Sequence, residues 1–511
     1  MRVQATFVVC LLASTSLSTM AFAQPAESEA PPVTGKVEKV VVTAQRRPQQ
    51  AQGIGIALTP VSGDTLRKQG INNVNGLENI TPSLEIENQF GSGQPSFTIR
   101  GLGFRDYATN NTPTVGIYVD DVAYPIPVMT QGVLYDIQSV EVLRGPQGTL
   151  YGRNTTGGAI NIISNNPTPE LGGGFQIEYG RFDEARAEGY FNAPLGDGVS
   201  VRLSAATQQG GAWQINRETG EELGAADKVA ARAQVDLALS DNFDLLLNVH
   251  AYRDQSDGIG KQLFVDFVGV GLAAPAAAHT GRLTSWGTSP GFAAVAGIAP
   301  DGKPFRDNEG FGASANANVD LDFADLTYIF GYEHLDRREY NDFDALVENF
   351  ANVFFVSDIE VMSHEVRLAS KDEGPFSWIV GAYYATEDLD EDYNSGFGAS
   401  FGPGFDQVRT PYQQEVETLA FFGQTEYRFA PLWNIVAGLR WEHEDRDLID
   451  LGTFANGFGT FNFANGTGTD PILNPLVLED RSTSLDEVTG KLALEYKPDE
   501  DVLLYASVSR G

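Results

Sequence analysis

The sequence predicts a mainly β protein, in which an antiparallel transmembrane β-barrel follows a small N-terminal α+β domain. Segments with one apolar and one polar face repeat from about residue 175 to the end of the chain. Short and long connections alternate between these segments, and the stretch before them mixes short helices with short strands. Alternating faces joined by connections sorted by length are typical of barrels that cross a lipid bilayer.

The predicted barrel strands alternate in side-chain character with a period of two, as in residues 419–429 and 435–444. Such alternation fits any antiparallel sheet with one wet face. Aromatic residues near the strand ends and charges on the second face favour a membrane barrel with a polar lumen. We expect Phe421, Leu439 and Trp441 to face lipid, and Gln424, Glu426, Arg428, Arg440 and Glu442 to face the lumen.

The connections between the predicted strands distinguish a membrane barrel from a soluble sandwich. We count about 13 strands, each of about 8 to 11 residues. A membrane barrel has tight turns on one side and long loops on the other, whereas a sandwich has no reason to sort loop length in this way. The predicted short links lie near residues 193–198, 240–242, 324–325, 371–375, 430–432 and 497–501, and the predicted long polar loops span 208–228, 253–313, 336–359, 387–416 and 446–485.

The N-terminus reads as a secretory signal peptide over residues 1–23. Arg2 precedes a short apolar core, and Ala21-Phe22-Ala23 fits a cleavage site. Residues 24–37 are rich in Pro, Ala and Glu, which predicts a disordered linker. The chain's one cysteine, Cys10, lies inside the removable core, so we expect no disulfide and no cysteine metal site.

Composition and motifs exclude several classes of function. With 68 acidic against 34 basic residues, the chain offers no basic patch for a nucleic-acid partner. His364-Glu365 and His443-Glu444 each lack the second histidine of a zinc protease, and no phosphate-binding loop occurs. We therefore expect no enzymatic activity, no cofactor and no metal site. Asp388, Asp390 and Asp392 resemble half of a calcium loop, and we expect them in a solvated extracellular loop.

Residues 52–166 form a separate unit with a mixed pattern. Ser62-Gly63-Asp64 predicts a helix start for residues 65–69, which Gly70 ends. A helical turn is expected over 77–80, and strands are expected over 97–100 and 115–119. The string Val140–Ser164 then joins two β runs through turns at Gly145-Pro146, Gly148, Gly152 and Gly157-Gly158.

Three motifs of this unit resemble the plug domain of TonB-dependent outer-membrane receptors, in particular siderophore receptors: Phe97–Gly101, Val119–Val122 and Val140–Ser164. The resemblance implies a plug over residues 52–166 and a barrel over 172–511. We expect Arg100 and Arg144 to form ion pairs within the plug or with the barrel rather than to contact ligand, because a buried arginine in a polar lumen is expected to be paired. The plug motif residues are Arg100, Gly101, Arg144, Gly145, Pro146, Gly148 and Gly152.

The same resemblance implies energised uptake of a scarce nutrient, most often a ferric siderophore, with cobalamin, haem or an oligosaccharide as alternatives. It places the protein in the outer membrane of a Gram-negative bacterium, among lipid and lipopolysaccharide, with its N-terminus in the periplasm. The implied partners are TonB, with ExbB and ExbD, and the extracellular ligand. A passive porin is the second hypothesis, which the plug argues against. A secreted β adhesin or enzyme is the third.

Two segments are candidates for binding. The run 38–44 has no obvious place in the plug pattern, and the resemblance makes it the TonB box, although a first plug strand is the alternative. Such a run would add a strand to a partner through backbone hydrogen bonds. The second segment follows a Gly-x-Gly turn and would contact ligand, unless it packs under the barrel wall. The expected TonB-binding residues are Glu38, Lys39, Val40, Val41, Val42 and Thr43, and the expected ligand-binding residues are Phe104, Arg105, Asp106 and Tyr107.

The resemblance finally predicts a chain truncated at its C-terminus, because the family's barrels have about 22 strands. An open sheet leaves unpaired backbone groups in hydrocarbon, at a cost of several kcal/mol each. We therefore expect residues 24–511 alone to fail to insert into a membrane.

Overall fold

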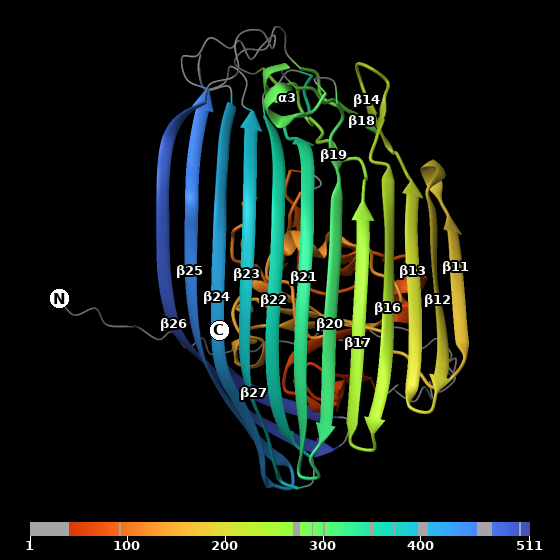
Figure 1. Cartoon of the computed structure of the whole chain (residues 1–511), viewed down its shortest axis with the longest axis vertical. Helices are drawn as coiled ribbons and strands as arrows, with labels where there is room; N and C mark the ends of the chain where they lie inside the picture. The colour runs from red at the N-terminus through yellow and green to blue at the C-terminus, as the bar shows by residue number, and fades with distance from the viewer. Residues whose placement is uncertain are drawn as a thin grey trace, which may run out of the picture. The chain divides into compact units, whose positions relative to one another are not determined.

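The computed structural model of the chain describes residues 40–90, 93–268, 276–288, 290–299, 302–347, 351–371, 374–396, 407–456, 473–499 and 502–511 (Figure 1). The predicted signal peptide and linker, and Glu38 and Lys39 of the candidate TonB box, lie outside the described residues. Residues 40–511 form one compact unit. Among the described residues, no helix has the length and apolar character needed to span a bilayer.

The larger part of the fold is one antiparallel sheet, which we call the wall sheet. It contains 14 strands, and all but β19 follow one another in chain order, so that the main path has the 13 strands predicted. β11 and β27 are the two ends of this path. The strands are β11 (Gly172–Tyr179), β12 (Ala185–Gly196), β13 (Val199–Gly210), β16 (Ala226–Ser240), β17 (Phe243–Asp254), β19 (Phe305–Arg306, beside β21), β20 (Asn308–Asp320), β21 (Ala324–Asp342), β22 (Asn352–Ser370), β23 (Phe376–Gly396), β24 (Gln407–Ala430), β25 (Trp433–Asn456), β26 (Leu473–Asp499) and β27 (Val502–Arg510).

The wall strands are much longer than predicted. β21 and β22 have 19 residues each, β24 and β25 have 24, and β26 has 27. The predicted loops 336–359, 387–416 and 446–485 are therefore strand over much of their length, and Asp388, Asp390 and Asp392 lie on β23 rather than in a loop. The apolar alternation fades where both faces are polar, but the backbone ladder between neighbouring strands continues. Side-chain periodicity alone could not detect this continuation.

The two faces of the wall sheet agree with the sequence pattern where the strands are long. Leu439 is 67% exposed on the outer face, whereas Arg440 is 3% exposed on the inner face, where it pairs with Glu442 at 2.6 Å. Gln424 is also buried on the inner face, and Phe421 and Trp441 are exposed. Arg428 differs from the prediction, because it is exposed near a turn and donates a hydrogen bond to the Gly374 carbonyl.

The plug is built around a five-stranded sheet of order β3-β9-β10-β7-β8. Its central strand, β10, runs parallel to β7 and antiparallel to β9. The predicted helix is α1, which Ser62 caps by accepting a hydrogen bond from the Thr65 amide, and which ends at Gly70 with φ of 66°. The elements are β3 (Ala57–Ser62), α1 (Gly63–Gln69), η2 (Val74–Asn79), β4 (Leu84–Asn88), β5 (Pro95–Ile99), β6 (Leu102–Gly103), β7 (Val115–Val119), β8 (Val122–Ala123), η3 (Pro127–Gln131), β9 (Ile137–Arg144), α2 (Gly148–Tyr151) and β10 (Gly158–Ser164).

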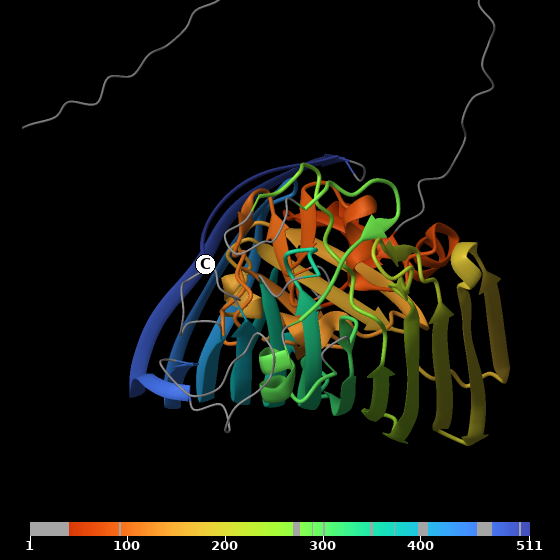
Figure 2. The same cartoon turned by 90° about the horizontal axis from the view of Figure 1, so that it is seen from above.

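The plug lies against the inner face of the curved wall sheet (Figure 2). The main hydrophobic core joins both parts, since Val140 and Ile160 of the plug cluster with Ile329, Ile359 and Leu389 of the wall. Two minor sheets and three short helices complete the described fold. The sheets are β1 (Val41–Val42) with β2 (Gln49–Gln50), and β14 (Gln214–Asn216) with β15 (Glu222–Leu223) and β18 (Leu283–Thr284), and the helices are η1 (Ala51–Gly53), η4 (Arg181–Asp183) and α3 (Pro290–Ala296).

The outer position of Leu439 can be tested by charge substitution. Leu439→Arg should lower the free energy of unfolding in phospholipid vesicles by about 2–4 kcal/mol, because it places a guanidinium in hydrocarbon. Asp447→Arg is the matched control, on the same strand and face but further along β25, and should cost little. Equal losses in the two variants, measured by denaturant titration, would contradict the assigned lipid-facing band.

Candidate functional site

The N-terminal run 40–44 is half exposed and half anchored. Val41 and Val42 pair antiparallel with Gln50 and Gln49. Val40 and Val41 are 43% and 59% exposed, whereas Val42 is 2% exposed. The expectation that the whole run lacks a place in the plug is therefore wrong for its second half, because the small side chains of Val42 and Ala44 fit the core beside Leu143 and Tyr151.

The backbone groups of Thr43 and Ala44 form hydrogen bonds that anchor these two residues. The Thr43 amide donates to the Glu141 carboxylate at 2.7 Å, and the Ala44 carbonyl accepts from the Tyr151 hydroxyl at 3.1 Å. Glu141 lies on β9 and is 1% exposed, and burial raises the pKa of its carboxyl. The exposed valines are thus the last residues before a firmly bound segment.

Arg46 is the centre of a buried charge cluster that joins the N-terminal segment, the plug and the wall. Its guanidinium pairs with Asp121 and lies 4.2 Å from the centroid of the Tyr151 ring. Arg367 of β22 reaches the same Asp121 at 3.0 Å and also pairs with Glu365. Positive φ angles at Asp120 and Asp121 turn the chain between β7 and β8 and so place this carboxylate.

The charges of this cluster stabilise one another. Burial disfavours the ionised Asp121 carboxylate, but the guanidiniums of Arg367 and Arg46 outweigh burial and lower the pKa of Asp121 to about 2. Burial likewise disfavours charged Arg46, but Asp121 and Glu365 outweigh it and raise the pKa of Arg46. Removing one partner would leave the others buried and uncompensated.

Two further ion-pair groups tie the plug to distant wall strands. Arg153, which follows α2, pairs with Glu387 of β23 and with Glu444 of β25 at 2.8 Å. Asp136, just before β9, accepts two hydrogen bonds from Arg202 of β13, at 2.7 and 2.5 Å. The plug is therefore held at both β13 and β23–β25.

The plug motif residues have structural roles of different kinds. Gly152 has φ of 81°, which favours glycine, and a Cβ there would lie 2.6 Å from the Arg440 guanidinium. A glycine at this position therefore lets the Arg440–Glu442 ion pair of the wall approach the plug backbone. The expectation of ion pairs for Arg100 and Arg144 is not met within the described residues. Arg100 is exposed in a tight turn with φ of 53°, and the Nε of Arg144 is buried without a hydrogen-bond partner.

The predicted ligand-binding segment is accessible, and its four residues differ in their contacts. Phe104 is 50% exposed and Tyr107 is 41% exposed. Asp106 accepts hydrogen bonds from the Tyr107 and Ala108 amides, so its carboxylate shapes the turn. Arg105 pairs with Glu85 at 3.1 Å and with Glu87 at 3.5 Å on β4. Phe104 and Tyr107 are thus the two members left to contact a ligand.

Phe104 lines a pocket of about 570 Å³ between the plug and the wall. The plug side adds Asn110, Asn111, Thr112 and Thr114, and the wall adds Gln414, Arg446, Leu448, Arg481, Ser482 and Thr483. The lining offers amides, hydroxyls and two guanidiniums to an oxygen-rich ligand. Each guanidinium is paired with a carboxylate of its own strand, Arg446 with Glu444 at 3.0 Å and Arg481 with Glu479 at 2.8 Å. We call the pocket lined by Phe104 and by these plug and wall residues the upper pocket. Its wall residues fall in segments predicted to be loops, so the sequence pattern did not mark them as part of a site.

Tyr107 belongs to an aromatic cluster beside this pocket. Its ring lies 5.0 Å from that of Phe90 and 5.5 Å from that of Tyr393. Phe90 also packs edge-on against Phe343, and Phe355 packs against Tyr393 at 4.9 Å. No pattern in the sequence marks the wall aromatics as part of this site. Each is an ordinary inner-face or loop residue in the sequence, and only the pairing of β22 with β23 brings them together.

Comparison with known proteins identifies both parts of the fold. Residues 50–159 match the family described as the TonB-dependent receptor plug domain, and residues 251–511 match the TonB dependent receptor-like β-barrel. The pesticin receptor of Yersinia pestis is 32% identical over 206 residues, which are 40% of this chain and 30% of that protein. The ferripyoverdine receptor of Pseudomonas aeruginosa is 24% identical over 193 residues, 38% of this chain and 22% of that protein.

Solved structures share the fold. The ferric yersiniabactin uptake receptor FyuA from Yersinia pestis superposes with a TM-score of 0.71 at 20% identity, covering 88% of this chain and 64% of its own. The siderophore receptor PiuA from Acinetobacter baumannii gives a TM-score of 0.68 at 15% identity, covering 92% of this chain and 66% of its own. The match to the curated pesticin receptor spans about a third of that protein's length.

The buried charge cluster predicts a large effect of a small substitution. Asp121→Asn should lower the free energy of unfolding at neutral pH by about 3–5 kcal/mol, because it leaves buried Arg46 without its ion-pair partner and Arg367 with Glu365 alone. Asp64→Asn, which removes an exposed pair with Arg67 on α1, is the control and should cost under about 1 kcal/mol.

The same variant should also alter the response to acid. The lowered pKa of Asp121 stabilises the fold fully above about pH 4, and this contribution is lost as the pH falls through about 2. The stability difference between the native chain and Asp121→Asn should therefore shrink between these values, measured by urea titration. A difference that stays constant down to pH 2 would contradict the role of Asp121.

Proposed function

Since this chain belongs to the TonB-dependent receptors, we propose that it takes up a ferric siderophore across the outer membrane, with energy supplied through TonB. The upper pocket is the proposed binding site, and the run Val40–Thr43, of which Val40 and Val41 are exposed, is the proposed contact with TonB. ExbB and ExbD are the proposed further components of the energy supply. The family consists of receptors and transporters rather than enzymes.

The observation that carries this proposal is the upper pocket between plug and wall. A ferric siderophore presents oxygen donors and, in many cases, negative charge. Arg446 and Arg481 supply guanidiniums, Asn110 and Asn111 supply amides, and Phe104 supplies apolar surface. Its volume of about 570 Å³ lies within the range of ordinary small-molecule sites. The siderophore receptors among its relatives support the same ligand class.

The anchored plug supports energised uptake over passive diffusion. Ion pairs at Arg153 and Asp136 hold the plug against the inner face of the wall sheet, where a porin would have an aqueous channel. A solute could pass only if these contacts rearranged. The exposed valines at the start of the anchored segment offer an edge that a periplasmic partner could pair with and pull, which supports a periplasmic N-terminus.

Substitutions in the upper pocket test the ligand class. Arg481→Gln, and Arg446→Gln in a second variant, should each weaken binding of ferric siderophores by about tenfold or more, because a charge-assisted contact is lost. Arg253→Gln, which breaks an exposed pair with Glu309, is the control and should leave affinity unchanged. Ligand-induced quenching of tryptophan fluorescence measures the affinity. Unchanged affinity in both pocket variants would reject the pocket as the binding site.

Substitutions at Val41 test the contact with TonB separately. Val41→Pro removes a backbone donor and bends the segment, so uptake should fail while surface binding of the ligand persists. Val41→Thr keeps both the donor and the β-branched shape, and should transport nearly as well as the native chain. Accumulation of radioactive iron in cells separates uptake from binding. Equal uptake by the two variants would reject strand pairing at this run.

A further inference from the structure

The outer face of the wall carries a continuous row of ionisable side chains. Register places His334 of β21 opposite Glu360 of β22, Glu360 opposite Asp388 of β23, and Asp388 opposite Glu415 of β24. Asp447 of β25 continues the row beside Glu415. Carboxylates directly opposite one another in a sheet repel, so this row lowers the stability of the sheet unless cations compensate it.

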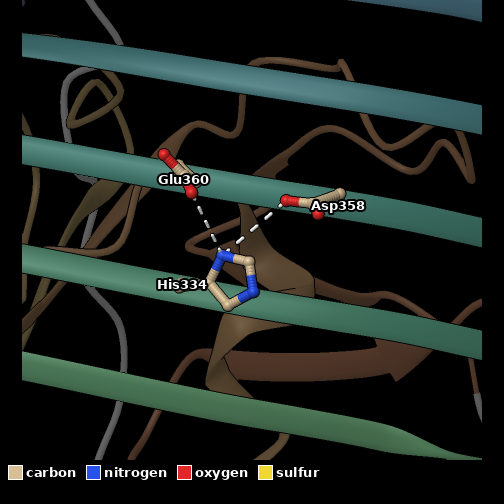
Figure 3. A group of neighbouring side chains, drawn as sticks. All are labelled: His334, Asp358 and Glu360. Atoms are coloured by element: carbon tan, nitrogen blue, oxygen red, sulfur yellow. Dashed lines mark ion pairs between the residues drawn. The ribbon is translucent and has the colours of Figure 1, made fainter.

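One group in this row has the geometry of a metal site (Figure 3). The Nδ1 of His334 lies 3.7 Å from Asp358 Oδ1 and 3.6 Å from Glu360 Oε1. The three ligand atoms all lie within 4.8 Å of one another. The two His334 distances are too long for hydrogen bonds. They are close to the spacing of about 3.4 Å between two donors that bind a tetrahedral ion at about 2.1 Å.

The protonation pattern around His334 leaves Nδ1 available. The other ring nitrogen, Nε2, lies 3.3 Å from Asp336 Oδ2, and because a carboxylate only accepts, this bond places a proton on Nε2. In the neutral ring, Nδ1 then carries a lone pair, and this atom is buried without a hydrogen-bond partner. Metal-binding histidines characteristically donate their second nitrogen to a carboxylate in this way.

The neighbouring Tyr332 contributes to the same arrangement. Its hydroxyl donates to Glu360 Oε1 at 3.3 Å and so orients the carboxylate. Exposure of the His334 side chain is 23%, against 55% for Asp358 and 50% for Glu360. The imidazole thus forms the floor of the site, and the carboxylates form its open sides, where water can complete the coordination.

A second histidine on the same face provides an internal contrast. His443 of β25 also lies between two carboxylates, but its Nδ1 is 3.0 Å from Asp486 and its Nε2 is 3.2 Å from Asp445. Each nitrogen therefore has its own acceptor, and the two carboxylates lie on different sides of the ring. This arrangement suits a protonated imidazole and does not direct three donors at one point.

We propose that His334, Asp358 and Glu360 bind one divalent cation of the zinc class on the outer face of the wall, linking β21 to β22. One imidazole with two carboxylates suits Zn²⁺ and its transition-metal neighbours better than Mg²⁺, which prefers all-oxygen sites. The site is separate from the upper pocket and does not depend on the proposed uptake function. Asp336 is a positioning residue, because it acts through the His334 ring.

Isothermal titration of the full chain in detergent, stripped with a chelator and then titrated with ZnCl₂ in excess Mg²⁺, tests this proposal. The native chain should bind Zn²⁺ at a saturable site that His334→Ala and Glu360→Gln abolish. Asp336→Asn should weaken it by about tenfold, as loss of an orienting partner does. His443→Ala, the matched control, should bind as the native chain does.

Substitution of Co²⁺ gives a readout that does not depend on stability. Bound Co²⁺ should show visible absorption bands of a site with a nitrogen ligand, and these should vanish in His334→Ala but persist in His443→Ala. Full competition by Mg²⁺, or equal losses in the two histidine variants, would show only a diffuse cation atmosphere over the acidic row and would overturn the proposal. Retention of the bands in His334→Ala would overturn it as well.

Discussion

A charged group removed from water must meet an opposite charge, and the contact between plug and wall depends on this requirement. The inner face of the wall sheet is polar, so covering it with a plug buries arginines and carboxylates together. Arg46, Asp121 and Arg367 satisfy one another at the N-terminal segment, and Arg153 does the same for Glu387 and Glu444. Because such pairs are directional, they fix the orientation of the plug more strictly than apolar contacts could.

The apolar core has a complementary role. The core cluster consists mostly of plug residues such as Val140 and Ile160, and the wall adds hydrophobic side chains such as Ile359 to it. The plug and wall therefore depend on each other for stability.

Sequence reasoning succeeded where the physical signal is local. A period of two placed Leu439 and Arg440 on opposite faces, and Ser62 with Gly70 marked the ends of α1. It failed where the signal is a pairing between distant strands. Arg446 and Arg481 were read as loop residues, because polar side chains on both faces of β25 and β26 hide the strand period. Nothing in the sequence connects Arg46 to Arg367, since only the folded sheet brings β22 to Asp121. Arg100 and Arg144 were expected to be paired and have no ion pair within the described part of the chain, because a motif specifies a turn more readily than a partner.

The small pair of β1 and β2 has a mechanical consequence. Val40 accepts a hydrogen bond from Ala51, and Val41 and Val42 pair with Gln50 and Gln49, so both free ends of this hairpin lie at the same side. Tension on the N-terminus therefore breaks the hydrogen bonds between β1 and β2 one after another, which requires little force. At Thr43 the load passes to Glu141 of β9 and, one residue later, to Tyr151 of α2. The first residues of the segment are therefore easily pulled away, whereas Thr43 and Ala44 are held firmly. These two residues are bound to β9 and α2, which contribute to the core of the plug.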